Sequence, residues 1–203
     1  MTTPTSAGSP PPYGAPPTRG TAELCAVADV GDEAKALLPD NGAAPPPKTF
    51  VAMLMERDLH ADAVRFLAHA LPRREAVWWA WVCARKVAGA EPAPPIKAAL
   101  DATERWIVQP TEEHRRHALA AGEAAEFGTS AGCAALAAFM SSGSLAPPEA
   151  PMVPPGEFMT AKAVSGSVTL AAVATEPDKA GAKFKEFVQL GIEVAERTKL
   201  WPA

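Results

Sequence analysis

The sequence has 203 residues, a net charge of −4 and a pI near 5.6, which together indicate one ordinary globular domain. No run of the chain is markedly basic, so we expect no nucleic acid partner. The most apolar stretches, residues 131–140 and 163–174, are far shorter than the ~20 residues of a membrane-spanning helix, so we expect no membrane partner.

Residues 1–18 form a proline-rich tail in which prolines stand among threonine, serine, glycine and alanine. Such a segment buries too little apolar area to offset its chain entropy, which predicts a disordered tail. It has no basic stretch followed by an apolar one, so it does not look like a secretory signal, and we expect a cytoplasmic protein. Residues 19–203 are expected to form a single helical domain.

The first half of this domain is predicted to consist of helices separated by prolines. One helix is expected over residues 21–38, ending at Pro39 and weakened in its middle by Gly31. A second includes Phe50 and Leu54, and a third covers residues 63–71.

The segment over residues 72–87 holds three tryptophans within four positions, Trp78, Trp79 and Trp81. On a helix they span about 300°, so they cannot all face one pocket, and at least one belongs to the core. Two interpretations stay open for this group. It is either core packing alone, or a partner-binding site with Arg73 and Arg74 in its polar rim.

The second half continues the same pattern of helix and proline. Helices are predicted over residues 96–107, 111–127, 131–140, 158–174 and 177–200, with a proline-rich loop over residues 141–157. No segment alternates like a strand. We therefore predict an all-α fold, a compact irregular bundle of about eight or nine helices or a set of stacked helical hairpins.

One polar cluster offers an alternative chemistry. Glu113, His114 and His117 stand at helical spacing, so two of them could face one ligand. A zincin helix, however, needs two histidines four residues apart around a glutamate, and this spacing is absent. The simpler interpretation is a solvated helix start with acidic residues at its positive end.

The remaining motifs point away from cofactor chemistry. The cysteines Cys25, Cys83 and Cys133 are scattered without a Cys-x-x-Cys pair, which predicts small buried residues and neither a disulfide framework nor a zinc site. No glycine-rich phosphate loop and no Gly-x-Ser-x-Gly elbow occurs. We therefore expect no cofactor and no enzymatic activity.

The run Leu-Pro-Arg-Arg-Glu-Ala-Val-Trp-Trp-Ala-Trp at residues 71–81 resembles a family of uncharacterised small bacterial proteins. Residues 159–163, residues 190–192 and the terminal Trp201-Pro202 extend this similarity. The resemblance implies a gene position near type VI secretion spike and effector genes, and hence an accessory role. It carries over no catalytic residue.

We therefore expect a non-enzymatic helical adaptor that binds another protein, and the resemblance implies a secretion spike or effector component as that partner. The predicted contact residues are Arg73, Arg74, Trp78, Trp79 and Trp81. On this hypothesis, Trp79→Ala abolishes partner capture while the melting temperature hardly changes. The alternative is a metal-binding protein or enzyme that uses Glu113, His114 and His117.

Overall fold

The computed structural model describes residues 19–40 and 42–201. All regular secondary structure within these residues is helical, so the predicted all-α fold is confirmed. The predicted disorder of residues 1–18 lies outside the described residues. The described part has ten α-helices and one 3-10 turn, with these bounds: α1 Thr21–Val27, α2 Asp32–Lys35, α3 Pro47–Glu56, α4 His60–Ala70, α5 Arg73–Ala88, α6 Pro94–Val108, α7 Glu112–Ala124, α8 Ser130–Phe139, α9 Met159–Val173, η1 Pro177–Lys179 and α10 Ala180–Arg197.

Proline and threonine define several helix starts. Pro47 and Pro94 lie in the first turns of α3 and α6, where a missing N–H breaks no intrahelical bond. The Thr111 hydroxyl accepts a hydrogen bond from His114 N at 3.2 Å and begins α7. Thr129 does the same for α8, because its hydroxyl accepts from Gly132 N at 3.0 Å.

The prediction of one helix over residues 21–38 is wrong, because this segment forms two short helices, α1 and α2. The chain turns between them at Asp29, which has a left-handed φ of 51°. Gly31 N then donates a hydrogen bond to Asp62 Oδ1 of α4 at 2.9 Å. The break between α1 and α2 therefore coincides with a contact to a residue that is distant in the sequence. Because of this break, the structure has one helix more than the nine that were predicted.

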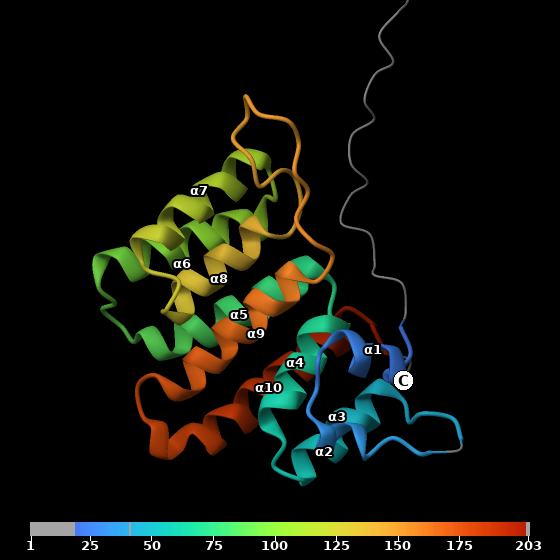
Figure 1. Ribbon diagram of the computed structural model, residues 1–203. Helices are drawn as coiled ribbons and strands as arrows, with labels where there is room; N and C mark the ends of the chain where they lie inside the picture. The colour runs from blue at the N-terminus through green and yellow to red at the C-terminus, as the bar shows by residue number, and fades with distance from the viewer. Residues whose placement is uncertain (1–18, 41, 202–203) are drawn as a thin grey trace, which may run out of the picture.

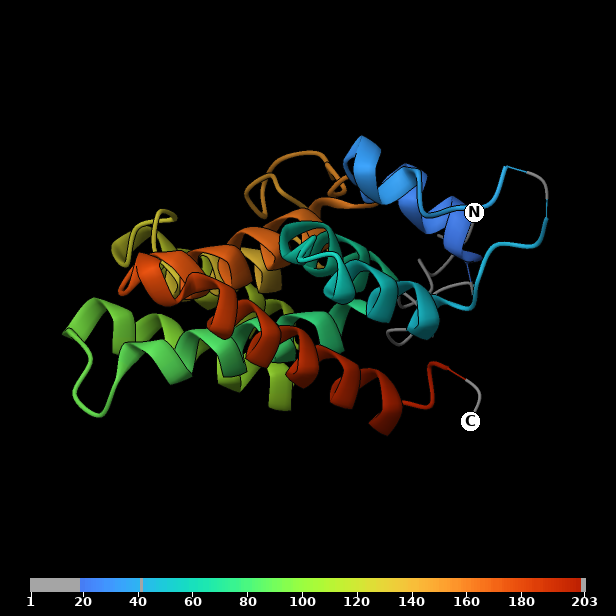
Figure 2. The same cartoon turned by 90° about the horizontal axis from the view of Figure 1, so that it is seen from below.

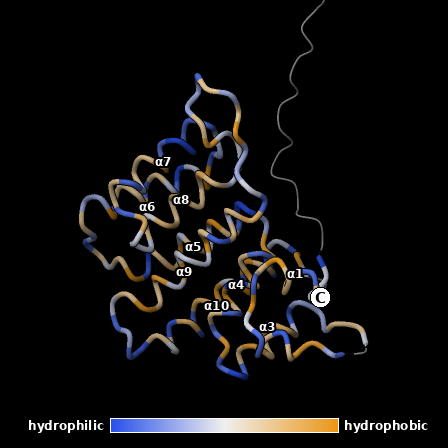
Figure 3. The backbone as a smooth tube through the Cα atoms, in the orientation of Figure 1, coloured by the Kyte–Doolittle hydropathy of each residue, from blue (hydrophilic) through white to orange (hydrophobic). Residues whose placement is uncertain are grey.

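The helices α5 and α9 lie at the centre of the bundle (Figure 1). On one side, α8 packs on both of them and also on α6 and α7. On the other side, α4 packs on α9, and α10 contacts α4, α5 and α9 (Figure 2). Hydrophobic and hydrophilic residues alternate along the helices in Figure 3, as expected for helices that each turn one face toward the core.

The three cysteines are free thiols and are buried, as predicted. Burial raises the pKa of Cys25 to about 11 and also raises the pKa of Cys83 and Cys133. Cys133 Sγ donates to Ala163 O of α9 at 3.2 Å, so this thiol lies in the contact between α8 and α9. The described residues include no helix that is both long and apolar enough for a membrane span.

Candidate functional site

Trp79 is fully buried, with an exposed fraction of 0%, so it cannot contact a partner from this position. Its Nε1 donates to Phe187 O of α10 at 2.8 Å. The backbone of α10 approaches the indole closely, because a Cβ built on Gly191 would lie 2.9 Å from Trp79 Cε2. The assignment of Trp79 as a contact residue is therefore wrong, and this side chain belongs to the core.

The other two tryptophans are half-buried and point to different neighbours. Trp81 Nε1 donates to Leu100 O of α6 at 3.0 Å. The guanidinium of Arg197, at the end of α10, lies 5.8 Å from the ring centroid of Trp78. The three indoles thus do not line one pocket, as their spacing on the helix predicted.

Arg73 and Arg74 hold the ends of other segments by donating to backbone carbonyls. Arg73 donates to Ser141 O at 2.8 Å and to Glu157 O at 3.2 Å, at the two ends of the proline-rich loop. Arg74 Nε donates to Ile107 O at 2.7 Å, in the last turn of α6. Basic side chains are favourable there, because the last carbonyls of a helix have no intrahelical donor.

A second arginine pair, which the sequence did not identify, holds the same loop from α7. Arg115 is 1% exposed and donates to Phe139 O at 2.5 Å and to Ser144 O at 2.8 Å. Its Nε also donates to Glu112 Oε2 at 2.7 Å. Arg116 donates to Glu112 Oε1 at 2.6 Å and to Ala146 O at 2.9 Å. The loop is therefore connected to α7 by several charge-assisted hydrogen bonds.

Hydrogen bonds from Arg115, and then the positive charges of Arg115 and Arg116, keep the pKa of Glu112 below its usual value. A carboxyl with a lowered pKa in the folded state stabilises the fold above its unfolded pKa of about 4.3, and this contribution is lost as the pH falls through the folded pKa. We expect the urea midpoint of the wild type to fall more steeply between pH 5 and pH 3 than that of Glu112→Gln. The two curves should converge at the acidic end, and parallel curves would contradict this role.

Large apolar side chains are exposed where these arginine-held segments meet. Val108 at the end of α6 is 72% exposed, and Met152 and Val153 in the loop are 71% and 49% exposed. In Figure 1 the loop lies beside the start of α7, to which Arg115 and Arg116 connect it. We call this region the loop end of the bundle. It consists of the end of α6, the start of α7 and the loop over residues 141–157.

The alternative polar cluster does not assemble. Glu113 and His117 are exposed, and His114 Nδ1 lies 2.8 Å from Gln109 O, to which it donates. Within residues 19–40 and 42–201, no three His, Cys, Asp or Glu side chains are grouped to hold a metal ion. Glu113, His114 and His117 therefore have no geometric basis as a joint ligand set.

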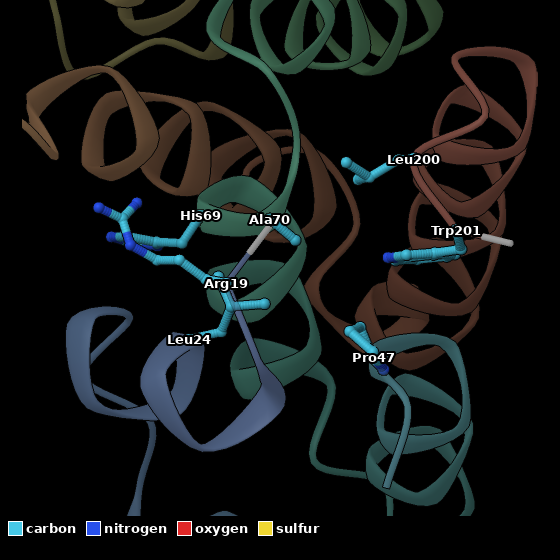
Figure 4. A pocket seen from close by; sticks show the side chains of 7 residues that line it. All are labelled: Arg19, Leu24, Pro47, His69, Ala70, Leu200 and Trp201. Atoms are coloured by element: carbon cyan, nitrogen blue, oxygen red, sulfur yellow. The ribbon is translucent and has the colours of Figure 1, made fainter. Parts of the chain in front are cut away.

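A small cavity lies between α1, α3, α4 and the C-terminal segment (Figure 4). Arg19, His69 and Trp201 are among its lining residues. Its volume of about 30 Å³ admits one or two water molecules. Pockets for organic ligands hold roughly 300–1,000 Å³, so this cavity is no candidate for a substrate site.

The chain was compared with known proteins and protein families. The model of a protein family of unknown function matches residues 50–195, from within α3 to the last turns of α10. No curated protein and no solved structure matches the chain.

Proposed function

The chain belongs to this family, DUF6931, and we propose that it is a helical adaptor that binds another protein through its loop end and is not itself an enzyme. One observation supports this proposal above the others. Val108 and Met152 are large apolar side chains exposed by more than two thirds. Val108 O accepts from Arg74 at 3.4 Å, and Met152 lies in the loop whose Ser144 and Ala146 carbonyls accept from Arg115 and Arg116. A contiguous patch of exposed apolar side chains is typical of a protein contact site, and an ordered backbone lowers the entropy cost of binding.

The proposal moves the contact site from the tryptophan group to the loop end. Arg73 and Arg74 stay within this site, since they hold the ends of the loop and of α6. Trp78 is half-buried beside Arg197 of α10, and Trp81 is half-buried and bonded to Leu100 O of α6. In this proposal their role is to hold α5 against these helices, and they do not contact the partner.

The proposal places the protein in the cytoplasm, where its buried thiols remain reduced. A type VI secretion spike or effector component as the partner rests only on the resemblance of residues 71–81 and stays a prediction. The family match names no partner.

We expect Met152→Glu to weaken partner capture at least about tenfold, because truncation or charging of an apolar anchor in an interface commonly costs 2 kcal/mol or more. The measurement is a quantitative pull-down from the native cells with tagged wild type and variants. The stability of the variant should stay within about 0.5 kcal/mol of the wild type, because the side chain is exposed.

Ala120→Glu is the matched control, since it adds the same charge at an exposed position of α7. The recovery of a partner should be unchanged with this control, at least about tenfold lower with Met152→Glu and reduced to a smaller extent with Val108→Gln. Equal recovery with all variants would refute the loop end as the contact site.

A further inference from the structure

Residues 150–155, Ala-Pro-Met-Val-Pro-Pro, follow a turn that Ala150 N closes by donating to Pro147 O, and their prolines favour an extended backbone. Each proline fixes its φ near −65°. The helical region is disfavoured for a residue that precedes proline, and this applies to Ala150, Val153 and Pro154. No peptide bond in the described part of the chain is cis. The segment therefore has the conformational preferences of a polyproline II stretch.

This extended segment is attached to the bundle through Val153. Leu145 N donates to Val153 O at 2.7 Å, and Val153 N donates to Ser144 Oγ at 3.0 Å. The carbonyl of Ser144 in turn accepts from Arg115 at 2.8 Å. The segment is thus ordered before any partner arrives, which reduces the entropy cost of binding.

The outer side of the segment is almost wholly apolar. Met152 is 71% exposed, and its neighbours Pro151, Val153 and Pro154 are exposed too. A methionine side chain is unbranched and adapts to an apolar pocket. Met152 is therefore the side chain best placed to enter a pocket on a partner.

The backbone of this segment is unsuited to pairing with a β-strand. Residues 151, 154 and 155 are prolines and have no N–H. The N–H of Val153 already donates to Ser144 Oγ, which leaves only the N–H of Met152 within residues 151–155. Such a segment presents carbonyl acceptors and apolar side chains, the features that aromatic-lined grooves recognise in polyproline II ligands.

We propose that residues 150–155 are a recognition peptide displayed by the bundle, and that the partner binds them in an aromatic-lined groove with a pocket for Met152. This inference rests on the proposed adaptor function and specifies the chemistry of its partner. Val108 then contributes to the rim of the contact and not to its centre.

The test uses the full chain with the photoreactive residue benzoylphenylalanine at position 152, at position 108, or at the control position 120. After irradiation in the native cells, mass spectrometry identifies the cross-linked protein and the residue that reacted. We expect a specific cross-link from position 152, none from position 120, and attachment within an aromatic-lined groove. Attachment to a strand edge or to an apolar helix would overturn the inference.

A synthetic peptide with residues 148–156 provides a second readout. In excess, it should reduce cross-linking from position 152 at least tenfold. The same peptide with Pro151 and Pro154 replaced by alanine should compete poorly, because it loses the extended preference. Equal competition by both peptides, or none by either, would overturn the inference.

The three positions separate this inference from the adaptor proposal. A cross-link from position 108 without one from position 152 overturns the recognition peptide and leaves the adaptor function standing. The absence of a specific cross-link from both positions overturns both proposals.

Discussion

The variant Trp79→Ala is expected to lose about 3–5 kcal/mol of the free energy of unfolding, the usual cost of removing a buried tryptophan. Three features of its surroundings support this value. The side chain is fully buried, its Nε1 donates to Phe187 O, and a Cβ at position 191 would have no room beside its ring. The space left by the indole cannot close easily, because α10 contacts α4 and α9 as well as α5. Urea denaturation monitored by circular dichroism measures the loss.

Two matched variants test the explanation. Trp79→Phe keeps most of the ring but leaves Phe187 O without its donor, so it should cost about 1–3 kcal/mol. Trp78→Ala removes an indole of the same size from a half-buried position and should cost clearly less than Trp79→Ala. If Trp78→Ala and Trp79→Ala destabilise equally, burial of Trp79 is not the cause.

The variant Arg115→Met is expected to lose about 3 kcal/mol or more, because two carbonyls lose a charged donor and each such bond contributes about 1.5–3 kcal/mol. Methionine retains the apolar stem of the side chain, so the loss reports mainly on the guanidinium. This group donates to Phe139 O and Ser144 O and lies 4.3 Å from the Phe139 ring centroid. Denaturation gives the total loss, and hydrogen exchange of residues 141–157 should show that the loop opens.

Arg116→Met is the control, since Arg116 contacts the same glutamate and the same loop from a more exposed position. Arg116 makes one short bond to a carbonyl, that of Ala146, and its ion pair is of the exposed kind that contributes about 0–1 kcal/mol, so a loss clearly smaller than that of Arg115→Met is expected. A loss as large as that of Arg115→Met would show that burial of the guanidinium is unimportant.

The sequence predicts most helix boundaries because their causes are local. Pro94 and Thr111 mark helix starts through a missing N–H and a capping hydroxyl, and both depend only on residues in the adjacent turn. The break between α1 and α2 differs, because Gly31 N donates to Asp62, a residue of another helix. No pattern within residues 21–38 identifies that acceptor.

The site was harder to predict than the fold. Periodicity showed that Trp78, Trp79 and Trp81 face different directions, but it could not show which direction α10 covers. The role of Arg73 was also hidden, since its acceptors Ser141 O and Glu157 O are distant backbone atoms. Met152 and Val153 did leave a local signal, because apolar residues within a proline-rich loop have no helix of their own in which to be buried.

The two hydrogen bonds that Arg73 donates have a consequence for protein engineering. One side chain joins the two ends of the loop, at Ser141 and at Glu157, and so fixes their separation whatever lies between them. Doubling the length of a flexible loop costs only about 0.6 kcal/mol of closure entropy. Foreign sequence such as an epitope or a small domain, inserted between the exposed residues Pro148 and Glu149, should therefore be carried without disturbing the helices.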